Sequence, residues 1–149
     1  MPPLKGIDRG LNGDALKVLE EAGHGTQIVI VDPSYDIPEY ARVIPYQGDS
    51  SASALMGILS LVPHEKDGAY DVTCMAADEG EADAGAAFKE VTDDLGLDLG
   101  YQPRLETLGG IEPGFYADAN GIEKRTIFFR TRDEKTYACA RFTVGHSQK

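Results

Sequence analysis

The sequence predicts a single-domain α/β layered fold over residues 1–149, with a mostly parallel sheet and helices on both faces. Segments with helical spacing alternate with short apolar segments, the order typical of a parallel sheet. One apolar segment, "QIVIVD" at residues 27–32, is a β-branched run of the kind found in strands covered on both faces. A length of 149 residues and a hydrophobic content of 42% are sufficient for one core.

The first helix is expected over residues 13–22. Asn12 is a favourable N-cap, and Leu11 and Leu16 occupy the positions of a hydrophobic staple around it. Gly23 is a natural C-terminal stop. The strand over residues 27–32 follows at once.

The chain after this strand is predicted from turn residues and spacing. The segment 32–49 carries three prolines and three tyrosines and is interpreted as a loop. A second helix begins at Ser50 or Ser51 and ends before Pro63, and a third covers residues 79–96. Further strands are expected at residues 70–77, 104–110, 125–131 and 137–144, with a weak helix or turn at 113–124.

Composition restricts the possible partners and the cellular compartment. The net charge of -11 repels polyanions, so neither nucleic acid nor a membrane surface is an expected partner. Cys74 and Cys139 lie far apart in strand-like runs, which favours a reduced, cytoplasmic protein over a disulfide framework or zinc site. The N-terminal residues lack the apolar core of a secretory signal. No dinucleotide, phosphate-loop, calcium or metal motif is present, so no cofactor is expected.

Two residues flank the first strand and are candidates for chemistry. His24 stands between Gly23 and Gly25, and its position after a helix is also explained by the helix dipole. Asp32 stands at the carboxyl end of the strand, where ligands bind in open α/β sheets, although aspartate before proline is also a common turn. Tyr116 and Tyr137 are consistent with packing in the protein as well as with a place in a functional site.

The order of these pieces resembles the RbsD/FucU sugar mutarotase family, which contains L-fucose mutarotase and D-ribose pyranase. The resemblance rests on "LKGIDRGLNGDALKVLEEAGHGTQIVIVD", in which a Lys-Gly pair precedes a helix ending in Gly-His and a strand ending in Asp. The segments "VTCMAADEG", "GFY" and "YACARF" resemble its central strand, its Phe-Tyr motif and its Tyr-x-Asn motif. The Gly-His-Gly form is nearer to the fucose branch.

The resemblance implies roles for particular residues. His24 would transfer protons, while Asp32 and Tyr137 would bind the sugar; Tyr116 corresponds to the tyrosine of the Phe-Tyr motif. Two positions depart from the family. Cys139 replaces the asparagine of Tyr-x-Asn, and Glu112 replaces a basic residue of the fucose branch, which implies a changed sugar preference.

The implied activity is the interconversion of anomers of a free monosaccharide, L-fucose or a related aldose. Ring opening and closure require only proton transfer, and histidine is the side chain suited to it near neutral pH. A monosaccharide-binding module without catalysis and a purely structural protein are the alternatives. The family also implies a ring-like homo-oligomer, such as a decamer. His24 and Asp32 lie eight residues apart, so either the chain bends between Gly25 and Gln27 or two subunits share each site.

Overall fold

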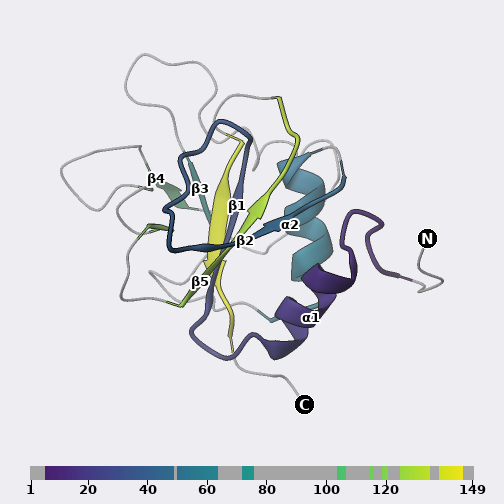
Figure 1. Cartoon of the computed structure of the whole chain (residues 1–149). Helices are drawn as coiled ribbons and strands as arrows, with labels where there is room; N and C mark the ends of the chain where they lie inside the picture. The colour runs from purple at the N-terminus through teal and green to yellow at the C-terminus, as the bar shows by residue number, and fades with distance from the viewer. Residues whose placement is uncertain are drawn as a thin grey trace.

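The computed structural model describes residues 6–48, 50–63, 72–75, 104–106, 115, 119–120, 125–134 and 138–145. Within these ranges the chain forms two helices and six strands (Figure 1). In chain order they are α1 (Gly13–Glu21), β1 (Gln27–Val31), β2 (Arg42–Pro45), α2 (Ser51–Leu59), β3 (Thr73–Met75), β4 (Arg104–Glu106), β5 (Thr126–Arg130) and β6 (Ala140–Thr143).

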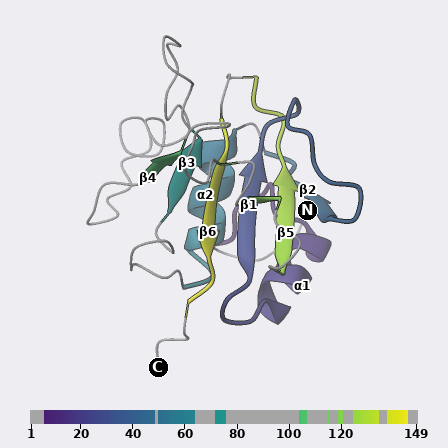
Figure 2. The ribbon, with the colours of Figure 1, turned by 90° about the vertical axis from the view of Figure 1, so that its left-hand side faces the viewer.

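The six strands form one mixed sheet in the order β2-β5-β1-β6-β3-β4 (Figure 2). Three of its five pairings, β1–β5, β2–β5 and β3–β4, are parallel. The two pairings of β6, with β1 and with β3, are antiparallel. The prediction of a mostly parallel sheet in an α/β fold is therefore confirmed. The last two strands along the chain are not neighbours, because β1 lies between β5 and β6.

Strand β1 is central and fully enclosed. All five of its residues are buried, and it pairs with β5 along one edge and β6 along the other. Its side chains alternate between the two faces, with Ile28 and Ile30 in one apolar cluster and Val29 and Val31 in the other. The continuous apolar sequence is thus explained by burial on both faces.

Both described helices cover the same face of the sheet. Ala15, Val18 and Leu19 of α1 and Leu55 and Ile58 of α2 belong to the cluster that contains Ile28 and Ile30. On the opposite face, Val29 and Phe128 pack with the aromatic side chains Tyr35 and Phe115. The helix expected over residues 79–96 lies outside the described residues, so helices on both faces stay a prediction.

The caps of the two helices agree with the sequence analysis. The Asn12 side chain accepts a hydrogen bond from the Ala15 amide at 2.9 Å, and α1 ends at Glu21. The Ser50 hydroxyl accepts from the Ser53 amide at 3.0 Å, and α2 begins at Ser51. Because each N-cap satisfies an amide that has no partner within its helix, it sets where the helix begins.

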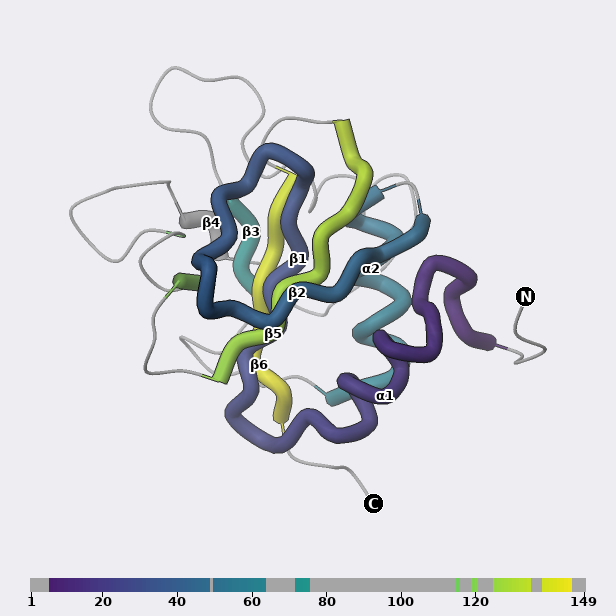
Figure 3. The backbone as a smooth tube through the Cα atoms, viewed as in Figure 1, coloured from purple at the N-terminus to yellow at the C-terminus, as the bar shows by residue number. Residues whose placement is uncertain are grey.

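The interpretation of residues 32–49 as a loop is wrong over residues 42–45. These form β2, which pairs in parallel with β5 at the edge of the sheet (Figure 3). Proline is tolerated on an edge strand, because an edge leaves one row of amides without partners in the sheet. Pro45 is the last residue of β2. Turn residues alone thus predicted a loop where tertiary pairing forms a strand.

A buried polar network fixes α2 to the carboxyl edge of the sheet. The Asp133 carboxylate accepts from the Ser51 amide at 2.9 Å, at the first residue of α2. The Ser51 hydroxyl bonds the Thr131 hydroxyl at 2.9 Å, and Thr131 in turn donates to the Val31 carbonyl at 3.0 Å. A carboxylate is favourable at a helix N-terminus. The network therefore links α2 directly to the end of β1.

Candidate functional site

His24 stands on a tight turn that precedes β1. The Thr26 amide donates to the Gly23 carbonyl at 3.1 Å, which closes the turn, and Gly25 adopts a φ of +92°. The turn is attached to the end of β6, because the Gly25 amide donates to the Val144 carbonyl and the Val144 amide donates to the Thr26 carbonyl. His24 itself is exposed. The turn thus presents an imidazole to solvent from a backbone held in place.

The glycines beside His24 differ in what they contribute. A Cβ added to Gly23 or to Gly25 would meet nothing within 4 Å, so neither glycine is required for packing. Both positions therefore border open space beside the histidine. Only Gly25 has a left-handed backbone, which residues with a Cβ adopt at a cost.

Asp32 lies at the other end of β1 and is 5% exposed. Its Oδ1 accepts from the Ser34 amide at 3.1 Å and from the Ser34 hydroxyl at 2.8 Å. These bonds form a local turn in which an aspartate side chain replaces a backbone acceptor. The carboxylate is therefore held at the carboxyl edge of the sheet.

Cys139 meets Asp32 at this edge, because β6 runs antiparallel to β1. Burial of the thiol, together with the negative charge of Asp32 beside it, raises the pKa of Cys139 well above its ordinary value. The thiol consequently stays protonated in the folded protein at neutral pH. Of the predicted site residues that the structure describes, Asp32 and Cys139 are brought together.

His24 is separated from this pair by the whole of β1. The strand is paired without interruption from Gln27 to Val31 against β5, which excludes a bend within it. Five residues of strand span roughly 16 Å, more than one monosaccharide covers. Figure 3 shows the two ends of β1 at opposite edges of the sheet. Within one subunit, the full length of β1 therefore lies between His24 and Asp32.

The remaining candidates, Glu112, Tyr116 and Tyr137, lie outside the described residues. Neighbouring aromatic residues can be placed. Tyr35 is 4% exposed, donates to the Asn120 side-chain oxygen at 2.7 Å, and packs against Phe115 and Phe128 with ring centroids 6.2 and 5.9 Å away. The tyrosine-rich segment after Pro33 therefore uses Tyr35 within its own chain. The Tyr40 hydroxyl also donates to the Asn120 carbonyl at 2.5 Å, although Tyr40 is 63% exposed.

A buried arginine on the face opposite the helices was missed by the sequence analysis. Arg141 of β6 is 3% exposed, donates to the Gln27 side-chain oxygen at 3.1 Å and lies 5.9 Å from the centroid of the Phe115 ring. Gln27 in turn donates to the Thr126 hydroxyl at 3.2 Å. The available signal was a lone charge inside the apolar strand sequence "YACARFTV", because a buried cation needs polar or aromatic partners.

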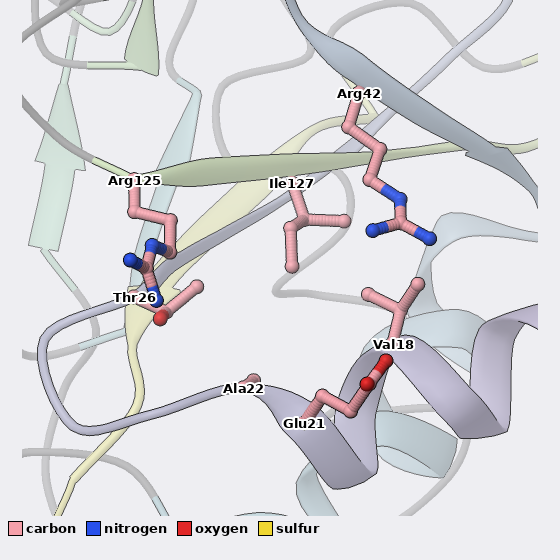
Figure 4. Close-up of a pocket in the computed structure, with 7 residues that line it drawn as sticks. All are labelled: Val18, Glu21, Ala22, Thr26, Arg42, Arg125 and Ile127. Carbon is pink, nitrogen blue, oxygen red and sulfur yellow. The ribbon is translucent and has the colours of Figure 1, made fainter.

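A pocket of about 290 Å³ lies between α1 and the strands β2 and β5 (Figure 4). Ala22 and Thr26, which flank the His24 turn, both line it. Neither His24 nor Asp32 does. Within the described residues, no group of three or more His, Cys, Asp or Glu is arranged to hold a metal ion. No helix in this described part of the chain is long and apolar enough to cross a membrane.

The fold and the two ends of β1 define an α/β protein with an exposed histidine turn at one sheet edge and a buried carboxylate at the other. The model of the RbsD / FucU transport protein family matches residues 5–146, and the chain belongs to this family. The resemblance stated from the sequence is thereby confirmed.

Individual relatives are similar over most of the chain. The L-fucose mutarotases of two Histophilus somni strains, 2336 and 129Pt, are each 29% identical over 103 residues, or 68% of this chain and 72% of theirs. The crystal structure of the fucose mutarotase from Streptococcus pneumoniae in complex with L-fucose has a TM-score of 0.73 at 24% identity, covering 97% of this chain and 100% of that one. FucU from Bifidobacterium longum has a TM-score of 0.69 at 25% identity, with the same coverage.

The conformation of Gly25 gives a direct test of the turn. Gly25→Ala is expected to destabilise the protein by about 1–2 kcal/mol, because an L-residue disfavours the left-handed region. Gly23→Ala is the matched control, since it has equal space and an ordinary φ, and should change stability by less than about 0.5 kcal/mol. Urea unfolding measures both. Equal effects of the two changes would contradict the assigned turn.

The raised pKa of Cys139 predicts a loss of stability in alkali. Above the ordinary thiol pKa of 9.0, the unfolded chain loses this proton while the folded chain keeps it, so the free energy of unfolding falls as pH rises. Between pH 8 and pH 10 the wild type should lose about 1.4 kcal/mol more than Cys139→Ser, whose hydroxyl does not ionise. Parallel pH profiles of the two proteins would show that Cys139 is not a buried, protonated thiol.

Proposed function

We propose that this protein is a mutarotase that interconverts the anomers of a free monosaccharide, L-fucose or a related aldose. The observation that carries the proposal is membership of the RbsD / FucU family over residues 5–146, with curated relatives named L-fucose mutarotase. The exposed His24 on its hydrogen-bonded turn supplies the group that the reaction needs.

The reaction requires proton transfer at two oxygens. The anomeric hydroxyl loses a proton, the ring oxygen gains one, and the ring opens to an aldehyde. Rotation of the aldehyde and closure on its other face give the other anomer. An imidazole near neutral pH both donates and accepts protons, which suits His24 to this role. No hydride or phosphoryl group is transferred, so the proposed chemistry uses no cofactor.

Asp32 is proposed to bind the sugar rather than to exchange protons. Its carboxylate is buried, and Ser34 holds one of its oxygens in place, so it offers a fixed acceptor for sugar hydroxyls. Tyr137, Tyr116 and Glu112 are proposed to complete the sugar contacts, following the family pattern.

Cys139 is proposed to alter the sugar preference. Where the family has an amide, this chain has a protonated thiol beside Asp32, which is a weaker hydrogen-bond donor and acceptor. The site would therefore make fewer strong bonds to hydroxyls than that of an L-fucose mutarotase, which favours a related aldose as natural substrate.

The site is proposed to be shared between subunits of a ring-like homo-oligomer. One subunit places His24 and Asp32 at opposite ends of β1, so a complete pair would combine His24 of one subunit with Asp32 of its neighbour. Tyr40 is 63% exposed and belongs to the segment that follows Asp32, which suits it to such a contact. The two buried cysteines, Cys74 and Cys139, form no disulfide, which agrees with the cytoplasm as the proposed location.

The proposed mutarotase activity is tested by replacing His24. His24→Ala should lower catalysed anomer exchange by about 10²–10⁴-fold, the usual contribution of a positioned acid–base group. The fold should persist, because His24 is exposed. Saturation-transfer NMR on a panel of aldoses measures exchange, and Glu20→Ala, at another exposed residue, serves as control. Binding of sugar by the wild type without exchange would instead identify a binding module.

The shared site is tested by mixing two inactive variants, His24→Ala and Asp32→Asn. The asparagine oxygen can still accept the bonds from Ser34, which protects the local turn. After subunit exchange at equal amounts, half of the subunits carry His24 and half carry Asp32, so about a quarter of shared sites should be complete. Mass spectrometry confirms mixing. Mixed oligomers without exchange activity would show that each subunit carries its own complete pair.

A further inference from the structure

The pocket between α1 and the β2–β5 pair has charged walls and an apolar floor. Arg42 of β2 and Arg125, just before β5, project on either side of Ile127 (Figure 4). Glu21 projects from α1 on the opposite wall, and its carboxylate is drawn near Val18, on the Arg42 side of the pocket. Val18, Ala22 and Ile127 supply the apolar lining. The pocket therefore combines two cations, one anion and a hydrocarbon surface within about 290 Å³.

The two guanidinium groups have no partner in the part of the chain that the structure describes. Neither Arg42 nor Arg125 makes a side-chain hydrogen bond or an ion pair there, and the same holds for Glu21. The chain has 25 acidic and 14 basic residues, so carboxylates outnumber basic groups over the protein as a whole. With two arginines and one glutamate, the pocket lining is nevertheless net positive on an acidic protein.

Thr26 adds a hydroxyl to the pocket lining. The residue is 2% exposed, and Figure 4 draws it at the same end of the pocket as Arg125. An arginine fork with a neighbouring hydroxyl is a common arrangement for binding carboxylate or phosphate oxygens. The Glu21 carboxylate can only accept hydrogen bonds, so it suits ligand groups that donate them, such as hydroxyls.

We propose that this pocket binds a small polyhydroxylated acid, such as a sugar acid or sugar phosphate, with its oxyanion at Arg125, Arg42 and Thr26. Its hydroxyl groups face Glu21, and its C–H face packs on Val18 and Ile127. A volume of about 290 Å³ accommodates a single sugar unit rather than an oligomer. This site is distinct from Asp32, at the opposite end of β1, and it does not depend on mutarotation.

The experiment is an NMR titration of the wild-type protein at low salt with galacturonate, glucose 6-phosphate and inorganic phosphate. The amides of Gly25 and Thr26 report occupancy, because Thr26 lines the pocket. Both sugar derivatives should bind more tightly than inorganic phosphate, which lacks hydroxyl groups for Glu21. Comparison of galacturonate with glucose 6-phosphate distinguishes a carboxylate ligand from a phosphate ligand.

Variants assign the binding to the pocket. Arg125→Gln and Arg42→Gln should each weaken binding by roughly three- to tenfold, and the double variant should abolish it. Arg9→Gln removes an equal charge at an exposed residue elsewhere and should leave affinity unchanged. For inorganic phosphate, Glu21→Gln should strengthen binding because it removes a repulsive carboxylate, whereas Glu20→Gln, its exposed neighbour that does not line the pocket, should not.

Three results would overturn the proposal. The first is no saturable shift at Gly25 and Thr26 with any of the three anions. The second is equal weakening by Arg9→Gln and Arg125→Gln, which would reveal a general charge effect. The third combines two observations: the wild type binds no anion, and the double arginine variant changes its oligomeric mass. That result would identify the pocket as a contact between subunits. Because binding is measured directly, none of these results bears on anomer exchange.

Discussion

The fold depends on the enclosure of β1 by hydrogen bonds along both edges and by apolar side chains on both faces. Every residue from Gln27 to Val31 is buried. Because an unpaired buried amide or carbonyl is costly, β5 and β6 must both be present for β1 to be stable. The two helices then cover one face, and Tyr35 and Phe115 pack on the other. The candidate functional groups lie where this enclosed strand begins and ends.

The rigid central strand also fixes the separation between the residues that precede and follow it. His24 precedes β1 and Asp32 follows it, so the same pairing that stabilises the sheet keeps the imidazole and the carboxylate apart. A bend that joined them would break ladder hydrogen bonds in the buried centre of the protein. A second copy of the chain offers a way to bring the two groups together without that cost, which is why the proposed oligomer and the proposed activity are physically linked.

The two ends of the central strand β1 differ in the charged groups that surround them. At the carboxyl edge, Asp32, Asp133 and the protonated Cys139 are buried and held by local hydrogen bonds or by a helix N-terminus. At the other edge, His24, Arg42 and Arg125 are exposed. In a chain with a net charge of -11, this places two exposed arginines at one end of β1 and the buried carboxylates at the other.

The sequence by itself determined the N-cap at Asn12, a second helix start at Ser50 or Ser51, a buried strand within residues 27–32, the fold class and the family. Caps, β-branched runs and motif order are local properties of the chain. Only the tertiary structure decided that residues 42–45 form a strand and that Cys139 lies beside Asp32. The same holds for the bond from Asp133 to the N-terminus of α2, across 82 residues of sequence. It also holds for the placement of Arg42 and Arg125 at one pocket. Each of these depends on which strands become neighbours. That choice is made by the packing of the whole sheet, so no short segment of sequence contains it.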